Sequence, residues 1–546
     1  MQAANRECPP LAGRHFDVLI IGGGINGVAI ARECVRCGKS VLLVEQHDFA
    51  SGTTSRSTRI IHGGLRYLEH GEIDLVRESL RERERLLAES PHLVHPLQFL
   101  LALPKEPFSL LRSTLAIRAG LWLYRHWAGR DHTRLTSREF EQLLDSERPL
   151  RVFAYEDAQC EFPERITAEW LTEATDGGAV ARNHTRALEI LRDKKAGRVT
   201  GARLQCQISG EEYAISASWI VNASGPWADA IVRESHIPAA QMIGGLRGSH
   251  LVLPRFSGMP DQAIYTEAID SRPIFVIPWN EQVLVGTSEV ADGNNPSNPQ
   301  PSGDEIEYLF QSFTHLFPHT GLTQADIRYS FAGIRPLPYT PKQEAAAITR
   351  RHIIHDHRSE GAVGMLSIIG GKLTTAASLA REVAEKLGLQ PSQPVSGFIP
   401  GSPANGLEST LHQWSLLVAS KAGISVASAE AIAEWHGRRA LAIACSAEHD
   451  ERWRAPLCSH TNHIVAEAVE AVRYEHAVTL GDILLRRVPI ALGACWSEAC
   501  SQEAAQKIGA ALGWEDWLIH RELEEFEQER ERFLHPNSGA KFPREA

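Results

Sequence analysis

The fold of this chain is decided by residues 16–45, which read FDVLIIGGGINGVAIARECVRCGKSVLLVE. An apolar run, a glycine turn, a helical pattern to about Gly38 and a second apolar run form a βαβ unit. Gly22-x-Gly24-x-x-Gly27 opens the helix, and Glu45 ends the second strand. Such a turn brings a pyrophosphate to the helix N-terminus, and the acid accepts hydrogen bonds from a ribose diol but repels a 2′-phosphate. The unit therefore predicts a bound dinucleotide other than NADP.

Composition excludes several classes of protein. The chain has 546 residues, of which 43% are hydrophobic and 23% are charged, an ordinary globular balance. Its formal net charge of −11 disfavours nucleic-acid binding, so no nucleic-acid partner is expected. No apolar run reaches the roughly 18 residues that span a bilayer, although the chain could lie on a membrane surface. Residues 1–14 are polar and lack the apolar core of a secretion signal, so we expect a cytoplasmic protein.

Cysteine and histidine patterns give no signal for a disulfide or a metal. The nine cysteines lack the dense spacing of a secreted scaffold and are expected as reduced thiols. Cys34-x-x-Cys37 falls in the first helix, where packing is the simplest interpretation. The histidines at 352, 355 and 357 are expected on a solvated strand or loop, and those at 460 and 463, with Glu467, lack a complete ligand set. No metal site is predicted.

Composition also divides the chain into domains. Residues 66–90 predict a charged helix with a solvated face, short strand-like runs between 150 and 330 indicate a mixed sheet, and the Pro/Gly/Ser-rich segment 391–406 is typical of a linker. We predict an α/β protein with a Rossmann-like dinucleotide-binding part, a mixed-sheet substrate part and an all-α C-terminal domain. The boundaries are 1–14 for a flexible tail; 15–90, 150–230 and 330–390 for the dinucleotide part; 91–149 and 231–329 for the substrate part; 407–535 for the helical domain; and 536–546 for a second tail.

The segments after the βαβ unit favour FAD over NAD. Residues 53–58 and 62–67 supply hydroxyls, glycines and a cation soon after Glu45, and a second glycine turn lies at Gly370-Gly371. An extended, buried FAD needs contacts from such distant loops, whereas an exchangeable nicotinamide does not. We expect FAD to be held non-covalently, because no His or Cys stands in an evident attachment motif.

Several blocks of sequence resemble the FAD-dependent, aerobic, quinone-linked glycerol-3-phosphate dehydrogenase family. They read GGGING at 22–27, IHGGLRYLE at 61–69, NASGPW at 222–227, GSH at 248–250, PW at 278–279, GIRPL at 333–337 and GGKLTT at 370–375. The likeness covers residues 16–390 and continues in the helical part. It implies that FAD is held by Gly22, Gly24, Asn26, Gly27, Glu45, Thr53, Thr54, Ser55, Ser57, Thr58, His62, Gly63, Gly64, Ser224, Gly225, Gly371, Lys372, Leu373 and Thr374.

The same resemblance implies residues for phosphate binding and proton transfer. Arg66 and Arg335 match arginines of the family's substrate site, and the planar fork of arginine suits a phosphate dianion. Lys372 would lie near substrate and flavin and stabilise negative charge, and Tyr67 would hydrogen-bond the substrate. Histidine ordinarily titrates near neutrality, so His250 is the expected general base, with Lys372 next. Catalysis is thus assigned to His250, Arg335 and Lys372.

By resemblance, the chain oxidises sn-glycerol 3-phosphate to dihydroxyacetone phosphate and passes the electrons to membrane quinone. Two alternatives keep the fold and the chemistry: another polyol phosphate, such as erythritol phosphate, or oxygen as the acceptor. In the arginine-rich segment 110–134, Arg118 and Arg125 share a helix face, with Trp122, Tyr124 and Trp127 nearby. Such a segment suits an anionic lipid surface. We therefore expect a peripheral protein on the inner face of the cell membrane, and a homodimer is compatible with the sequence.

Overall fold

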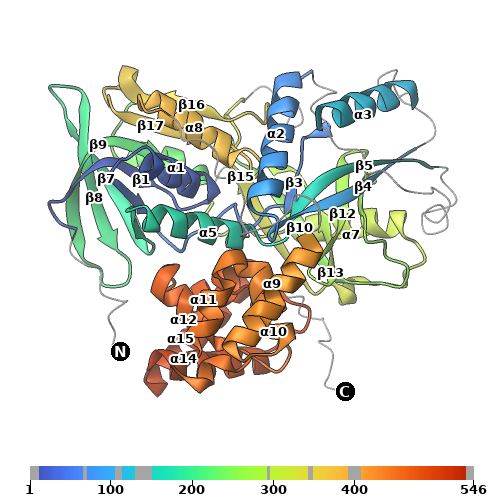
Figure 1. The fold of residues 1–546 in the computed structure, drawn as a ribbon. Helices are drawn as coiled ribbons and strands as arrows, with labels where there is room; N and C mark the ends of the chain where they lie inside the picture. The colour runs from blue at the N-terminus through green and yellow to red at the C-terminus, as the bar shows by residue number, and fades with distance from the viewer. Residues whose placement is uncertain are drawn as a thin grey trace.

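Two β-sheets lie side by side, and the C-terminal helices lie together beneath both of them (Figure 1). The structure is a computed structural model and describes residues 11–65, 71–104, 114–128, 150–291, 296–341, 348–390 and 407–535. Residues 11–14 were expected as the end of a loose tail, but they pack on the protein: Leu11 is buried, and Gly13 N donates to Ala214 O at 3.0 Å. The expected linker at 391–406 and the tail at 536–546 lie outside the described residues.

The first sheet contains the predicted βαβ unit. Its strands follow the order β16-β17-β9-β1-β2-β6, and β7 and β8 extend it from β9. β1 pairs in parallel with β2 and β9, and β9 pairs in parallel with β17. The carboxyl ends of β1 and β17, each followed by a glycine turn, therefore point to the same edge of the sheet, where ligands of such sheets bind. The strands are β1 His15–Ile21, β2 Val41–Val44, β6 Val180–Arg182, β7 Thr185–Asp193, β8 Arg198–Cys206, β9 Glu212–Asn222, β16 Ile353–Asp356 and β17 Met365–Ile369.

The second sheet is mostly antiparallel and has the order β14-β10-β13-β12-β11-β4-β5-β3, with β15 beside β10. Its strands are β3 Ile60–Ile61, β4 Val94–Pro104, β5 Leu150–Cys160, β10 Leu246–Pro254, β11 Ala263–Glu267, β12 Pro273–Trp279, β13 Gln282–Gly286, β14 Val290–Ala291 and β15 Tyr329–Arg335. The expected boundaries placed β3, β5 and β15 in the dinucleotide part. That placement differs from the structure, because β5 pairs along the whole of β4 and β15 pairs along β10.

Helices cover both sheets. The first sheet carries a layer in which α1 packs against both α5 and α8, α7 packs on β10 and β13 of the second sheet, and α2 contacts α3. The helices are α1 Ile25–Arg36, α2 Ile73–Glu89, α3 Thr114–Ala128, α5 Pro163–Asp176, α6 Ala228–Glu234, α7 Gly303–Leu316 and α8 Ala376–Lys386, with short 3-10 turns η3 Gly225–Trp227, η4 Gln324–Asp326 and η6 His357–Glu360.

Helix α2 is only partly the solvated helix that its charges predict. Arg77 and Arg81 are exposed, as expected. Glu82 and Arg83 are buried, and Arg83 Nη1 lies 2.7 Å from Asp157 Oδ1. The prediction is therefore right for one side of α2 and wrong for the other, because a buried carboxylate on β5 supplies the arginine with a partner.

The C-terminal part is helical, as predicted. It contains α9 Leu407–Ala422, α10 Val426–His436, η7 Gly437–Arg439, α11 Ala440–Ser446, η8 Glu451–Arg454, α12 Val465–Tyr474, α13 Leu480–Asp482, η9 Ile483–Arg487, η10 Ile490–Leu492, α14 Glu498–Leu512 and α15 Asp516–Leu534. Buried ion pairs dock it: Arg165 of α5 lies 2.8 Å from Glu475, and Arg487 lies 2.7 Å from Asp48. No single described helix is long and apolar enough to cross a membrane; the bent pair Thr410–Ala422 and Val426–Ser446 meets the criteria of length and composition only when taken together.

Candidate active site

A cavity of about 1230 Å³ is lined by residues of both sheets and of the C-terminal helices. It exceeds the roughly 300–1,000 Å³ of ordinary ligand pockets. Its wall contains both glycine turns, the loop at 51–58 and the strands that carry His250 and Arg335; the C-terminal domain adds Arg486, Glu529 and Phe533. The fold therefore gathers most of the predicted site residues around one space.

The first glycine turn is closed tightly on itself. Gly22 has a φ of +109°, which side chains disfavour, and a Cβ on Gly27 would collide with the Gly22 carbonyl oxygen. Glu45 Oε2 accepts a hydrogen bond from Gly23 N at 2.7 Å, and Glu45 Oε1 accepts one from His47 N at 3.0 Å. Burial raises the pKa of Glu45. Glu45 thus fixes the turn and lines the cavity at the position predicted for a ribose ligand.

The hydroxyl-rich loop after Glu45 forms another part of the wall. Its members that line the cavity include Thr53, Thr54, Ser55, Ser57 and Thr58. Thr54 Oγ1 accepts a hydrogen bond from Ile25 N at 3.1 Å, and Thr53 Oγ1 donates to Ile334 O at 2.7 Å. The hydroxyls of Ser55 and Ser57 bond within their own loop. These contacts tie the loop both to α1 and to β15, so the two sheets meet here.

The second glycine turn lies directly across from the first. Asn26 Nδ2 donates to Gly370 O at 3.3 Å, and Gly371, with a φ of +101°, has no room for a Cβ beside Asn26. Thr374 Oγ1 accepts a hydrogen bond from His62 N at 3.2 Å. The wall here also contains Gly64, Lys372, Leu373, Ser224 and Gly225. Asn26 Oδ1 is buried and has no hydrogen-bond partner among the described residues, as expected of an atom that faces a ligand.

Two predicted cofactor-binding glycines lie behind the cavity wall. Gly27 and Gly63 are not among the residues that line the cavity. A Cβ on Gly63 would collide with Leu80 and the Tyr124 hydroxyl, and Gly63 N donates to Asp157 Oδ1 at 3.2 Å. Asp157 also accepts from Tyr124 at 2.7 Å. The motif that contains Gly63 is thus held from behind by a buried carboxylate that the sequence analysis did not identify.

A group of charged side chains lies at the end of β15. Arg335 Nη1 lies 3.1 Å from Glu289 Oε1, and Arg350 Nη2 lies 3.2 Å from the same oxygen. Arg335 Nη2 also donates to Thr287 Oγ1 at 2.6 Å. All four residues line the cavity together with Lys372. Two arginines sharing one carboxylate, with a lysine nearby, leave a net positive charge that suits an anionic substrate group.

Burial lowers the pKa of three groups at this end of the cavity. Burial, helped by the charges of Arg335 and Arg59, lowers the pKa of His250 to about 3. Burial also lowers the pKa of Lys372 to about 7 and that of His62 to about 4. His250 Nε2 lies 3.0 Å from Thr58 Oγ1, and His250 Nδ1 is buried without a partner among the described residues. The expectation that His250 titrates near neutrality is therefore wrong: it is a neutral imidazole with one nitrogen left for a ligand.

The sequence analysis named two residues that lie outside the described part of the chain, and it missed three that lie at the site. Arg66 and Tyr67 lie outside the described residues. The sequence analysis missed Arg350, Glu289 and Asp157. Glu289 stands in the block GTSEVAD at 286–292, and its place in that block was the only feature of the sequence that could have indicated it. Arg350 lies in no glycine motif, so nothing in the sequence indicated its role.

The cysteine and histidine patterns separate only in part, because His355 and His357 lie together beside Glu360. Cys34 is buried and free, in agreement with packing. His352 and His357 are buried rather than solvated, which corrects the prediction; His352 lies 3.1 Å from Glu382 and His357 lies 2.7 Å from the Ser367 hydroxyl. His463 pairs with Glu467 at 2.9 Å, whereas His460 faces a different cluster.

Comparison with known proteins identifies the family. The model of the FAD dependent oxidoreductase family matches residues 17–386, which is more than half of the chain, and that of the C-terminal domain of alpha-glycerophosphate oxidase matches residues 365–518. The chain is 36% identical over 512 residues to the glycerol-3-phosphate dehydrogenase of Synechocystis sp., covering 89% of this chain and 91% of the relative. It belongs to the FAD-dependent glycerol-3-phosphate dehydrogenase family. The resemblance stated from the sequence is thereby confirmed.

Further relatives agree. The aerobic glycerol-3-phosphate dehydrogenase of Escherichia coli is 35% identical over 402 residues, covering 71% of this chain and 78% of the relative. The glycerol-3-phosphate dehydrogenase from Bacillus halodurans, solved in complex with FAD, has the same fold, with a TM-score of 0.75, 24% identity and 96% of both chains covered. The predicted fold class and the FAD cofactor are confirmed. The cavity fits FAD, since a pyrophosphate-binding turn, Glu45 and the buried Asn26 Oδ1 all face it.

Proposed function

We propose that this FAD-dependent dehydrogenase oxidises sn-glycerol 3-phosphate to dihydroxyacetone phosphate and delivers the electrons to membrane quinone. The observation that carries the substrate assignment is the cationic end of the cavity, where Arg335, Arg350 and Lys372 line the wall shared with the glycine turns. Relatives named glycerol-3-phosphate dehydrogenase, at 35–36% identity, support it.

The three cations suit the phosphate of a small polyol ester. Each arginine has a planar guanidinium that can bind two phosphate oxygens, and the lysine adds a compact charge. Glu289 holds both guanidinium groups, at 3.1 Å and 3.2 Å, and so positions them side by side on the cavity wall. Preorganised donors cost less entropy on binding, which favours a substrate that carries a dianion over the free polyol.

The hydroxyl of the substrate needs a proton acceptor and its carbon needs a hydride acceptor. FAD, when bound, accepts the hydride. His250 lines the cavity and has Nδ1 without a partner among the described residues, and on that geometry we assign it the hydroxyl proton. Its lowered pKa makes it a weak base, so Lys372, with a pKa of about 7, is the second candidate. Thr58 Oγ1, 3.0 Å from Nε2, and the ring of Phe331, stacked at 4.8 Å, fix the orientation of the imidazole.

The acceptor assignment rests on helix α3. Trp122 is 66% exposed and stacks on His126, and Arg118 is exposed on the same helix. An exposed indole beside basic groups suits the boundary between headgroups and acyl chains, where quinone is reached. Tyr124, expected at this surface, is instead buried against Asp157, and Arg125 Nη2 donates to Ala154 O at 2.7 Å. The lipid-facing part of α3 is therefore smaller than the sequence suggested.

A comparison of substrates tests the proposal. The specificity constant, kcat/KM, is measured with a soluble dye for sn-glycerol 3-phosphate, erythritol 4-phosphate and glycerol. We expect the first to exceed both others by at least about tenfold, because the cations recognise phosphate and the short carbon chain sets the distance to His250. A higher kcat/KM for erythritol 4-phosphate would show that erythritol 4-phosphate is the substrate. A kcat/KM for glycerol equal to that for sn-glycerol 3-phosphate would show that the cationic end does not recognise phosphate.

A further inference from the structure

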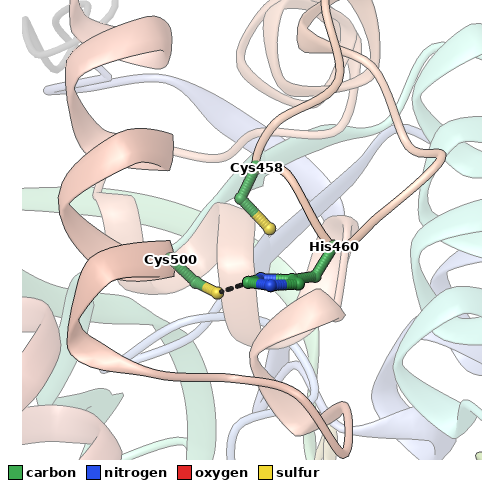
Figure 2. Close-up of side chains that lie close together, drawn as sticks. All are labelled: Cys458, His460 and Cys500. Carbon is green, nitrogen blue, oxygen red and sulfur yellow. Dashed lines mark hydrogen bonds between the residues drawn. The ribbon is translucent and has the colours of Figure 1, made fainter. Parts of the chain in front are cut away.

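Three side chains of the types that bind metal ions lie close together in the C-terminal domain, outside the wall of the cavity (Figure 2). Cys458 and His460 lie in the loop before α12, and Cys500 lies in the first turn of α14. Their ligand atoms all lie within 4.8 Å of one another, and His460 Nδ1 is 3.3 Å from Cys500 Sγ. Figure 2 shows both sulfur atoms and the imidazole directed toward a common space. Both thiols are buried, while His460 is exposed.

The loop that carries Cys458 and His460 is held in place by α14. Leu457 N donates to His463 O at 2.8 Å, which closes a hairpin over the loop. Ser459 N donates to Glu503 Oε2 at 3.0 Å, and Lys507 Nζ donates to Pro456 O at 2.7 Å. Cys500, Glu503 and Lys507 are spaced three and four residues apart, so they share one face of α14. The ligand atoms are therefore brought together by a braced loop and not by a chance approach of two flexible segments.

Cys495 lies near the three, although its Sγ is not part of the group of ligand atoms that all lie within 4.8 Å of one another. Cys495 Sγ lies 3.9 Å from the His460 carbonyl oxygen, and the Cys495 carbonyl oxygen lies 3.6 Å from Cys500 Sγ. Two pairs of residues, Cys458-x-His460 from the loop before α12 and Cys495-x-x-x-x-Cys500 from the start of α14 and the residues just before it, thus approach each other. Three cysteines and one histidine form a common ligand set of structural zinc sites. The sequence analysis predicted no metal, because the two pairs are far apart in the chain.

We propose that Cys458, His460, Cys495 and Cys500 bind one structural Zn²⁺ ion, which fastens the loop at 456–464 to α14. Bond lengths of about 2.3 Å to sulfur and about 2.1 Å to nitrogen place neighbouring tetrahedral ligands about 3.6 Å apart, close to the separation between His460 and Cys500. Thiolate and imidazole ligands select zinc over the oxygen-loving cations. The ion stabilises the C-terminal domain and takes no part in electron transfer.

Metal content tests the proposal on the FAD-loaded enzyme, purified with no chelator and no histidine tag. We expect about one zinc per chain in the wild type and in Cys445→Ser, a control whose half-buried cysteine lies on α11 of the same domain. Cys458→Ser and Cys500→Ser are expected to retain less than about a tenth of that zinc. FAD occupancy shows whether each variant is folded. Cys495→Ser is expected to raise the dissociation constant for Zn²⁺ by about tenfold or more.

Cobalt provides a second readout that does not depend on the variants. Zinc is removed from the wild-type enzyme and replaced with Co²⁺, and tetrahedral thiolate coordination gives absorption at longer wavelengths than oxidised flavin. Absence of both zinc and this absorption overturns the proposal, as does full zinc content in Cys458→Ser. A Cys458–Cys500 disulfide, found by alkylation and mass spectrometry, also overturns it. Unchanged zinc affinity in Cys495→Ser removes Cys495 from the ligand set.

Discussion

At the scale of single residues, the substrate end depends on one carboxylate shared by two arginines. Glu289 contacts both Arg335 and Arg350, which would otherwise repel each other in a half-buried site. A phosphate that enters finds both guanidinium groups already placed. The proposed specificity for a phosphate ester therefore rests on the arginines directly, and on Glu289 through them.

Replacing Arg335 with alanine tests this arrangement. The lost charge-assisted contact costs about 1.5–3 kcal/mol, which corresponds to roughly a 10- to 150-fold fall in kcat/KM for sn-glycerol 3-phosphate. Turnover of free glycerol, which has no phosphate, should fall far less. Steady-state kinetics with both substrates measures the difference, and Arg255→Ala, an exposed arginine at the end of β10, is the control. Equal losses on both substrates would mean that Arg335 acts on the flavin or the fold.

Lys372 makes substrate binding depend on pH. Its pKa of about 7 means that the ammonium form is lost as pH rises through neutrality, while the phosphate, with a second pKa near 6, stays a dianion. The substrate concentration for half-maximal flavin reduction should therefore rise above pH 7, approaching about tenfold per pH unit. Lys372→Arg should flatten this dependence, and Lys386→Arg, at an exposed position on α8, should not. A wild-type value that is flat or falls with pH would contradict the role.

At the scale of elements, the sequence predicted local motifs better than the pairing of distant strands. The βαβ unit, the strand and turn at Gly370-Gly371 and the helical C-terminal part were predicted, because glycine turns and apolar periodicity are local signals. The sequence did not predict that β5 and β15 belong to the second sheet, because their partners β4 and β10 lie far from them along the chain. The buried side of α2 was missed for the same reason, since Asp157 is its partner.

Helix α3 is the element that we predict to contact the membrane surface. Arg118 and Trp122 are exposed, so replacing them should leave the core intact. Arg118→Ala should weaken binding to anionic liposomes by about fivefold, since each basic residue near the surface contributes about 1 kcal/mol, and the double variant with Trp122→Ala should weaken it further. Co-sedimentation and quinone reductase rate measure this, with dye-linked activity expected to stay near normal. Arg203→Ala, exposed on β8, is the control. Sedimentation of the double variant at the wild-type level would exclude α3 as the contact.

At the scale of the whole molecule, the C-terminal domain completes the cavity. Phe533 lies under the guanidinium of Arg56, 4.7 Å from the ring centre, and Arg486 and Glu529 add charges to the same wall. Asp48, at the loop that follows β2, binds Arg487 of η9 at 2.7 Å and 2.8 Å, so the docking contacts lie beside the cofactor-binding motif. Composition could predict a helical domain but not this contact, which forms between residues about 440 positions apart.

The most direct test of the central claim is reduction of the bound flavin by substrate in the absence of oxygen. The purified yellow enzyme is mixed with sn-glycerol 3-phosphate under anaerobic conditions, and the absorbance of the oxidised flavin is followed. We predict complete bleaching in a single turnover, saturable in substrate, with about one dihydroxyacetone phosphate formed per FAD. FAD that stays oxidised with sn-glycerol 3-phosphate, while another donor bleaches it, would contradict the account.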